Sequence, residues 1–358
     1  MFERINNMTP FFFEDATEIG FEDQFYREGL DILALSELPD FNYSRAGIGT
    51  VTSDAGKVSF VAENIPRITD RGLLVEGGGG VNFFSYSEDY TDAAWTKLLA
   101  NVEPNAIPSP RVQGMMSKII ATGSGVHSIG QTITGVSTVS FYAKAGSLKW
   151  VAVEFDIGTA FPIAYFNLET GEIGNVNLLT ARIERAGRGA WRIHATIPAA
   201  NATVRFYPAI GNGGASFVAG SGPYAGGYIY LDMAQAHPAA APISYIGTQA
   251  AGVNLNSFDE TNIFFTPQED FTIYVEAELP EFSGADNILL AVTNASRSER
   301  VAIYRNDTGT MALQIGSDVS KLLKVRYIQK SVSFALQCRS PPTKHAFALT
   351  VVLYWHLM

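Results

Sequence analysis

Between about residue 115 and residue 247, apolar and polar residues alternate over short runs. Examples are "TVSFYAKAG", "KWVAVEFDI", "AWRIHATIP" and "YIYLDMAQA". Because successive side chains of a strand point to opposite faces, this period of two predicts strands with one buried face. Turn sequences such as "LETGE" and "RAGRGA" separate roughly eight strands, which predicts one antiparallel β-sandwich, a jelly roll. The residues predicted to face its core are Val139, Phe141, Val151, Val153, Phe155, Ile157, Trp191, Ile193, Ala195, Ile197, Ile229, Leu231 and Met233.

Shorter strand patterns lie on both sides of this region. "GTVT" and "VSFVA" flank "SDAGK", whose Asp and Gly predict a hairpin turn. After residue 255, "DFTIYVEAELP", "NILLAVTNA", "RVAIYRND" and "GTMALQIGS" predict four more strands, too few to close a second sandwich. We therefore predict an all-β chain with a strand-rich lead segment at 38–80, a jelly roll at 81–250 and an incomplete sandwich at 255–320.

The two ends of the chain differ in composition from the rest. The first 40 residues hold ten acidic residues against Arg4 and Arg27, and residues 1–37 are predicted to be an acidic, aromatic, extended arm. This arm either packs onto a partner or is a solvated leader. Residues 321–358 contain none of the 35 acidic residues but six Lys or Arg and the single cysteine. This anomalous basic tail is either a frameshift product or a segment that docks in an oligomer. Sequencing the nucleic acid around codon 320 would decide between the two.

Charge and composition exclude several function classes. A formal net charge of −10 disfavours sequence-independent binding to nucleic acid or to anionic membranes. No run of about 18 apolar residues predicts a membrane-spanning helix, and the N-terminus lacks the pattern of a signal peptide. We therefore expect synthesis in a cytoplasm and no membrane insertion. The single Cys338 excludes an intrachain disulfide or a cysteine-based zinc site, and the five histidines show no metal spacing.

An ordered set of short motifs carries a family resemblance. "LPDFNYSRAGIGTV", "NIPRI", "GLLVE" and "NFFSYSEDYTDAAWTK" are followed by "VSFYAKAG", "FNLETGEIG", "GAWRIHATIP" and "YIYLDMAQAHPAAAPISYIGT". Over Leu38 to Thr248 this order resembles bacteriophage tail and other virion proteins that carry a carbohydrate-binding-module-like sandwich. Residues 270–320 resemble the start of a concanavalin A-like or laminin G-like sandwich. The family usually has an Arg-Thr or similar pair before the Asn of the fourth motif, where this chain has "GGGGVN", so any contact made by that pair is in doubt.

The predicted sandwich leads to expectations about calcium and about the burial of two tryptophans. Sandwiches of this type often hold structural calcium through loop oxygens, which the loop "SEDYTD" offers without the spacing of an EF-hand. No other cofactor is expected. Trp95, at the end of the fourth motif, is predicted to pack beneath the sandwich on a short helical turn. Trp191 is in phase with Ile193 and is predicted to lie in the core.

The same alternation places polar and aromatic residues on the outward faces of the strands. Aromatic rings beside planar charged groups are what a glycan site needs, since rings stack on sugar C–H faces and charged groups bond hydroxyls. An ordinary solvated face, or one covered by another domain or subunit, is the alternative. The candidate glycan-binding residues are Tyr142, Trp150, Glu154, Asp156, His194, Arg205, Tyr207 and Tyr230.

Catalysis has little support in the sequence. Glu154 and Asp156 lie two apart on one strand face, a separation close to that of glycosidase carboxylates, but without an apolar pocket to shift a pKa. No Gly-x-Ser-x-Gly elbow occurs, so no catalytic residue is predicted.

The expected function is that of a non-enzymatic virion component of a tail or fibre. It would attach to host cell-surface polysaccharide through weak contacts repeated in a homo-oligomer, beside other virion proteins. Two alternatives stay open: a purely structural head or tail decoration and assembly protein, and a polysaccharide depolymerase.

Overall fold

The computed structural model describes the side chains of residues 43–45, 47–69, 73–74, 80–122, 125–213, 226–240 and 242–250, together with the backbone of strands between 17 and 44, at 72 and between 253 and 353. The chain divides into two compact units, Met1–Ile263 and Phe264–Met358. Strands dominate both units. The described residues contain no α-helix, only a single 3-10 turn, η3, at Gly187–Gly189. The chain is therefore an all-β protein, as its alternation predicts.

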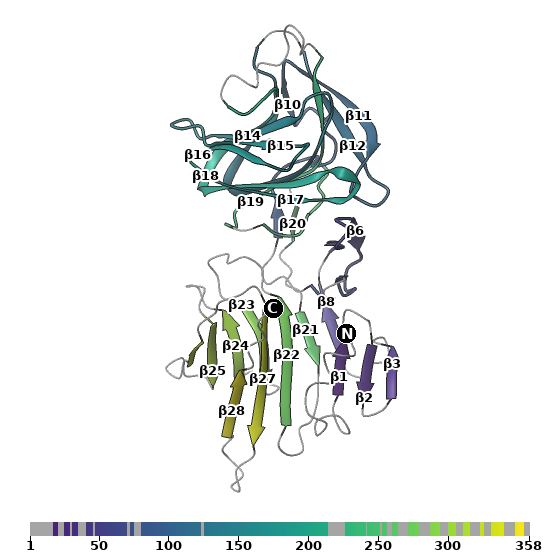
Figure 1. Cartoon of the computed structure of the whole chain (residues 1–358), viewed down its shortest axis with the longest axis vertical. Coiled ribbons are helices and arrows are strands. Elements are labelled where there is room, and N and C mark those ends of the chain that lie inside the picture. The colour runs from purple at the N-terminus through teal and green to yellow at the C-terminus, as the bar shows by residue number, and fades with distance from the viewer. Residues whose placement is uncertain are drawn as a thin grey trace. The chain divides into compact units, whose positions relative to one another are not determined.

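Ten antiparallel strands form the main sheet of the first unit (Figure 1). Its order is β11-β12-β19-β13-β18-β14-β15-β16, with β10 paired to β13 and β17 paired to β18. The strands are β10 (Thr96–Leu98), β11 (Ala100–Pro108), β12 (Met115–Ala121), β13 (Ser128–Ala145), β14 (Trp150–Asp156), β15 (Ile163–Asn167), β16 (Ile173–Asn177), β17 (Thr180–Arg185), β18 (Trp191–Ala209) and β19 (Tyr228–His237).

Two long strands fold this sheet into a sandwich. The first half of β13 pairs with β10 and with the second half of β18, which continues to β14, β15 and β16. The second half of β13 pairs with the first half of β18, which also pairs with β17. On its other side, this half of β13 pairs with β19, which continues to β12 and β11. Register shifts at Ile133/Val136 and Val136/Thr138 mark the bend in β13. We call the layer with β14 the first layer and the layer with β19 the second layer.

One hydrophobic core lies between the two layers. Phe155, Phe166 and Phe206 reach it from the first layer, and Phe141 and Leu231 reach it from the second. The predicted core positions on β13, β14 and the start of β18 are confirmed, since nearly all of them are fully buried. Trp191 is only half-buried: it packs against the rim of this core, and its Nε1 donates to the Leu168 carbonyl at 2.9 Å.

A bulge in β19 reverses the predicted phase of that strand. Ile229 and Leu231 face the core as expected, but Met233 has φ of 49° and packs in a second cluster on the outer side of the layer. Ala234 and Ala236 then take the core positions. Met233 is therefore buried as predicted, but on the opposite side of the layer from Ile229 and Leu231, because an inserted residue exchanges the two faces of a strand.

The chain enters and leaves the sandwich side by side. β9 (Gly80–Asn82) pairs with β20 (Val253–Leu255). The Asn82 amide donates to the Ala234 and Ile246 carbonyls at 3.0 and 2.7 Å, and its Oδ1 accepts from the N–H groups of Phe84 and Ala236. All four bonds are buried, so Asn82 fixes the entry segment to β19 and to the exit segment.

The motif "NFFSYSEDYTDAAWTK" forms the rest of this junction. Ser87 and Thr248 exchange hydrogen bonds at 3.1 and 2.9 Å, and Thr248 Oγ1 donates to the Phe84 carbonyl at 2.6 Å. Trp95 is 1% exposed, as expected, on a succession of turns, and its Nε1 donates to the Tyr86 carbonyl. The motif therefore closes one end of the core.

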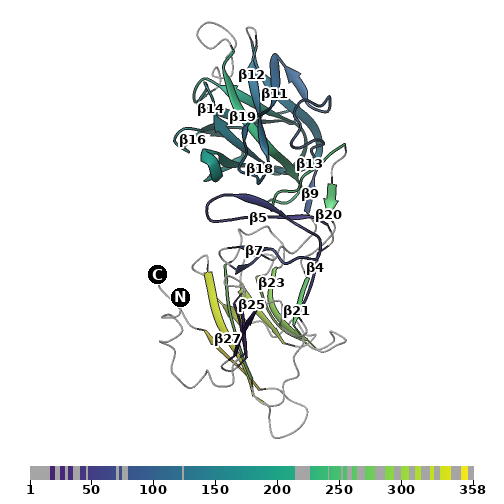
Figure 2. The ribbon, with the colours of Figure 1, turned by 90° about the vertical axis from the view of Figure 1, so that its right-hand side faces the viewer.

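The lead segment covers part of the second layer (Figure 2). β5 (Gly49–Thr52) and β6 (Val58–Val61) form the predicted hairpin, whose turn places Gly56 at φ 70°. The Gly187 N–H donates to the Gly56 carbonyl at 2.8 Å, and the Val58 N–H donates to the Pro110 carbonyl at 3.1 Å. These bonds attach the hairpin to the sandwich.

Two buried arginines explain the motifs "SRAG" and "NIPRI". Arg45 donates from Nη1 to the Ile65 carbonyl at 3.1 Å and from Nη2 to the Val61 carbonyl at 3.0 Å. Arg67 donates to the Thr50 carbonyl and to Ser244 Oγ. Both side chains fold the lead segment onto itself and onto the exit segment, which is a structural role.

The remaining strands of the first unit form small sheets. Within the predicted arm, β1 (Thr17–Gly20), β2 (Phe25–Glu28) and β3 (Asp31–Ala34) form an antiparallel sheet, so this part is not simply extended. β4 (Phe41–Ser44) pairs with β21 (Glu260–Ile263), and β7 (Ile68–Thr69) pairs with β8 (Gly72–Leu73). The role of the arm as an attachment segment stays a prediction. Residues 77–79 of the tetraglycine run lie outside the described residues.

The second unit contains two sheets. β22 (Phe271–Glu278), β27 (Ser331–Arg339) and β28 (Ala348–Leu353) form one; β23 (Asn287–Thr293), β24 (Arg300–Arg305), β25 (Met311–Ile315) and β26 (Leu323–Val325) form the other. β26, β27 and β28 fall within the residues predicted to be an anomalous tail, and β27 pairs along all of β22. The unit therefore extends past residue 320. The frameshift hypothesis stays a hypothesis.

Candidate functional site

The eight candidate residues lie on three separate surfaces. Five of them gather on the outward face of the first layer, which we call the β14 face: Trp150, Glu154, Asp156, Arg205 and Tyr207. Tyr142 and His194 lie on the part of the second layer that the lead and exit segments cover. Tyr230 lies farther along the second layer, where it is partly exposed and packs against the cluster that holds Met233. The sequence therefore predicts that these side chains point outward, but not that they divide in this way.

A network of charged groups occupies the centre of the β14 face. Glu154 and Asp156 both face outward from β14, and Arg205 reaches them from the neighbouring β18. Arg205 Nη1 donates to Glu154 Oε1 at 3.1 Å, and its Nη2 donates to Asp156 Oδ2 at 2.9 Å. The Tyr207 hydroxyl donates to the same Glu154 oxygen at 2.7 Å. One guanidinium therefore bridges the two carboxylates.

The backbone around this network makes room for it. Gly130 on β13 lies opposite Arg205, and a Cβ added there would be 3.2 Å from Arg205 Cγ. The absence of a side chain at residue 130 leaves the arginine stem free to cross the strand. The Gly158 N–H donates to Asp156 Oδ1 at 3.0 Å, which fixes the second carboxylate from the β14–β15 turn.

Burial and hydrogen bonding set the charges of the network. The Gly158 N–H and the Arg205 guanidinium lower the pKa of Asp156 below its usual value. Burial and the bond to Glu154 raise the pKa of the Tyr207 phenol, which therefore stays a donor. The network thus places two carboxyl groups against one guanidinium.

An aromatic platform lies beside the network. Trp150 begins β14 and is half-buried, and its ring packs over Gly174 on β16, where an added Cβ would be 2.7 Å from Trp150 Cζ3. Asn212 Oδ1 accepts from the Asn175 N–H at 2.6 Å and lies against the same glycine. Trp150 also packs with Tyr207 and Ile163. The exposed part of the indole is thus continuous with the polar network.

Tyr142 and His194 are not on an open surface, which corrects the expectation for them. Tyr142 is 2% exposed and packs in the outer cluster with Val58 of the hairpin and Tyr245 of the exit segment. His194 is also 2% exposed, and its Nε2 lies 3.0 Å from Glu184. Alternation identifies the outward face of a strand but cannot reveal that a distant segment covers it.

The covered surface holds ionisable groups that are unusually well buried. Burial lowers the pKa of His194 to about 4 and that of His237 to about 3, so both rings are neutral at pH 7. Both ring nitrogens of His237 are buried without a hydrogen-bond partner. The His194 hydrogen bond and the nearby Arg192 lower the pKa of Glu184 to about 2.

Asp232 is a buried acid on the outward side of β19, where the alternation pattern places it without indicating that it is buried. It is fully buried, accepts from Ser109 Oγ through Oδ2 and accepts from the Met233 N–H at 2.9 Å. Burial raises its pKa to about 7, and the Glu88 carboxylate adds to this shift. Arg111, whose charge lowers this pKa, lies 2.9 Å from Glu88 and is paired with it.

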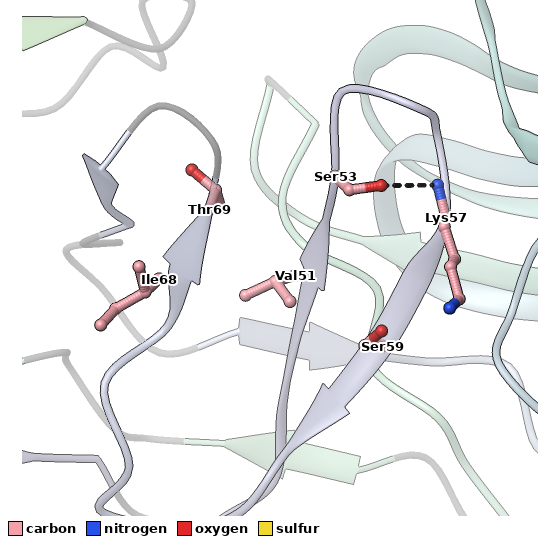
Figure 3. A pocket seen from close by; sticks show the side chains of 6 residues that line it. All are labelled: Val51, Ser53, Lys57, Ser59, Ile68 and Thr69. Atoms are coloured by element: carbon pink, nitrogen blue, oxygen red, sulfur yellow. Dashed lines mark hydrogen bonds between the residues drawn. The ribbon is translucent and has the colours of Figure 1, made fainter. Parts of the chain in front are cut away.

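A pocket of about 220 Å³ lies on the lead segment, away from these candidates (Figure 3). The Lys57 N–H donates to Ser53 Oγ at 3.3 Å at its rim. Its described lining includes neither a carboxylate nor an aromatic ring, so it offers no glycan chemistry of the kind predicted. The lining residues are Val51, Ser53, Lys57, Ser59, Ile68 and Thr69.

Two other kinds of site are absent from the residues that the structure describes. No group of three or more His, Cys, Asp or Glu side chains there has the arrangement of a metal site. In the same part of the chain, none of the helices found is long and apolar enough to cross a membrane.

Comparison with known proteins does not place the chain in a family. No family model matches it, and no curated protein matches it.

Proposed function

We propose that this chain is a non-enzymatic bacteriophage virion component, of a tail or fibre, whose jelly-roll sandwich binds host cell-surface polysaccharide through the β14 face. The convergence of Trp150 with Glu154, Asp156, Arg205 and Tyr207 on one face carries the carbohydrate part of this proposal. The virion part rests on the ordered motifs of the sequence. Assembly in the bacterial cytoplasm and repeated weak contacts in an oligomer follow from the same proposal.

The chemistry of the β14 face suits a neutral, hydroxyl-rich sugar. The half-exposed indole offers a ring for the C–H face of a pyranose. Carboxylate oxygens accept from sugar hydroxyls, and the guanidinium donates to them. With two carboxylates against one guanidinium, this face disfavours anionic sugars.

The same network argues against the depolymerase alternative. A general acid needs a carboxyl whose pKa is raised toward neutrality. On the β14 face, hydrogen bonds from Gly158 and Arg205 lower the pKa of Asp156, and Arg205 also pairs with Glu154. The pair is therefore better suited to holding hydroxyls than to donating a proton.

A binding experiment with the whole chain tests the proposal. The parent chain is applied to an array of bacterial surface polysaccharides. The affinity of each bound glycan is then measured by titration for the parent and for the Trp150→Ala variant. We expect affinity to fall about tenfold or more, because one stacking ring is lost. Phe60→Ala, at a 44% exposed aromatic residue on the β5–β6 hairpin, is the control and should bind normally. Absence of glycan binding at high protein concentration would refute the proposal.

An assembly role is a second candidate, favoured by the edge strand β16. β16 ends the strand order of the main sheet, and its residues carry no charge and no proline. Ile173, Val176 and the following Leu178 are 38, 42 and 65% exposed. Uncharged apolar edges are templates for pairing with another chain. If assembly is the main role, Val176→Lys should reduce the oligomeric state in sedimentation while glycan binding stays absent.

A further inference from the structure

The less covered end of the second layer carries a pair of tyrosines, of which Tyr230 also packs against the cluster that holds Met233. Tyr228 and Tyr230 lie on the same face of β19, with ring centroids 5.5 Å apart and ring planes at 75°. Tyr228 packs directly over Gly146, where an added Cβ would be 2.4 Å from its ring. Tyr230 lies between Lys118 on β12 and Lys144 on β13.

This end of the layer differs from the rest of the same face. On the rest of the face, the hairpin and the exit segment bury Tyr142, and His194 and Asp232 are also 2% exposed or less. Tyr228 and Tyr230, in contrast, are only half-buried. Half-exposed rings on an otherwise covered face offer a surface for a ligand. Edge-to-face geometry leaves the two rings with different orientations, so one sugar ring can contact both.

The charge of this patch is opposite to that of the chain. Lys118 Nζ lies 3.0 Å from the exposed carboxylate of Glu103 and 4.5 Å from the Tyr228 ring centroid. Lys144 Nζ donates to the Arg188 carbonyl at 2.7 Å, and no carboxylate in the described part of the chain forms an ion pair with it. Two ammonium groups therefore flank Tyr230 against one carboxylate, in a chain of net charge −10.

We propose that Tyr228, Tyr230, Lys118 and Lys144 form a second carbohydrate subsite that takes a carboxylate-bearing sugar, such as a uronic acid. This inference rests on the proposed glycan-binding function and deepens it. Tyr230 contacts the C–H face of the sugar, and Lys144 and Lys118 bind its carboxylate. The two subsites lie on opposite layers, so one sandwich contacts two different segments of polysaccharide.

The test uses the whole chain and a short oligogalacturonate, with its methyl ester as the neutral counterpart. Titration calorimetry should show binding of the acid, weaker binding of the ester, and a loss of affinity for the acid as salt rises. Tyr230→Ala should weaken binding of the acid about tenfold. Lys144→Gln should weaken it about threefold and reduce its dependence on salt.

Two controls separate this subsite from the β14 face. Lys57→Gln removes an exposed lysine on the hairpin and should leave binding of the acid unchanged, as should Trp150→Ala. Thermal unfolding of each variant shows that it is folded. If Trp150→Ala removes binding of the acid, or if Tyr230→Ala and Lys144→Gln leave it unchanged, the second subsite is refuted. Binding of a neutral glycan that depends on Trp150, without any binding of the acid, would refute the subsite and keep the proposed function.

Discussion

The two outward faces of the sandwich differ in what covers them. The β14 face carries a charged network in which each carboxylate has Arg205 as a partner, beside a half-exposed Trp150. The outward face of the second layer is largely closed by the lead hairpin and the exit segment. It buries Asp232 without a paired cation and His237 without a hydrogen-bond partner.

This contrast shows that outward-facing polar residues acquire different roles from the segments that pack on them. On the covered face, Tyr142 and His194 contribute to the junction between the lead segment and the sandwich. On the β14 face, Trp150, Asp156 and Arg205 remain partly exposed, whereas Glu154 and Tyr207 are 9% and 3% exposed. Substitutions on the covered face should therefore reduce mainly stability, and substitutions on the β14 face should reduce mainly ligand binding. The following variants test this difference.

Asn82→Ala should have the largest effect on stability. It leaves two buried carbonyls and two buried N–H groups at the junction without their partner. Because each buried unsatisfied group costs about 1 to 3 kcal/mol, we expect a loss of roughly 4 kcal/mol or failure to fold. Chemical denaturation measures it. A loss below about 1 kcal/mol would show that the junction is not held in this way.

Tyr142→Ala and Trp150→Ala compare the two faces directly. Tyr142 is fully packed in the outer cluster, so its truncation should cost about 3 to 5 kcal/mol. Trp150 is half-buried over Gly174, so its truncation should cost only about 1 to 2 kcal/mol while glycan binding falls. Equal losses of unfolding free energy would contradict the distinction between a covered and an open face.

The pH dependence of stability should report the buried Asp232. Its folded-state pKa of about 7 lies above the ordinary value of 3.8, so the folded protein binds this proton more tightly than the unfolded chain does. The resulting stability is fully present below about pH 4 and is lost as pH rises to about 7. Asp232→Asn mimics the protonated form. It should match the parent near pH 4 and exceed it by about 4 kcal/mol at pH 8.

The buried residues His194 and His237 change the stability with pH in the opposite direction to Asp232. Their lowered pKa values mean that the folded protein resists their protonation, so their contribution is lost as pH falls from about 6.5 toward 4. The parent should therefore be most stable near pH 6 to 7 in thermal unfolding. A difference between parent and Asp232→Asn that does not change with pH would contradict the assignment to Asp232.

Glu154→Gln should have the smallest effect on stability. Glutamine can still accept from Tyr207, but the ion pair with Arg205 is lost at the partly exposed surface. We expect a loss of about 1 kcal/mol, by chemical denaturation, because the amide oxygen still accepts from Tyr207 and Arg205 keeps its bond to Asp156. A loss above about 3 kcal/mol would place this network with the core rather than with an open site.

The fold and part of the site follow from local sequence pattern. Alternation correctly places Phe141, Phe155 and Ile193 in the core, and it correctly places Glu154 and Arg205 on an outward face. These assignments depend only on strand period. The hairpin at "SDAGK" follows from local turn chemistry in the same way.

The remaining features depend on contacts distant in sequence. The bulge at Met233 changes which of the following β19 residues face the core, and no single residue in "YIYLDMAQAH" indicates it. The burial of Tyr142 depends on Val58 and Tyr245, which lie about a hundred residues away in either direction. The periodicity of the strands and the composition of the chain therefore could not predict that the candidate residues lie on different surfaces.

Oxidative footprinting with and without bound polysaccharide tests the central claim most directly. Hydroxyl radicals label exposed side chains, and mass spectrometry reports the rate at each residue. The account predicts that saturating polysaccharide slows labelling of Trp150 and leaves Phe60 on the hairpin unchanged. Unchanged labelling of Trp150, with protection of Phe60 or of the β16 edge instead, would contradict it.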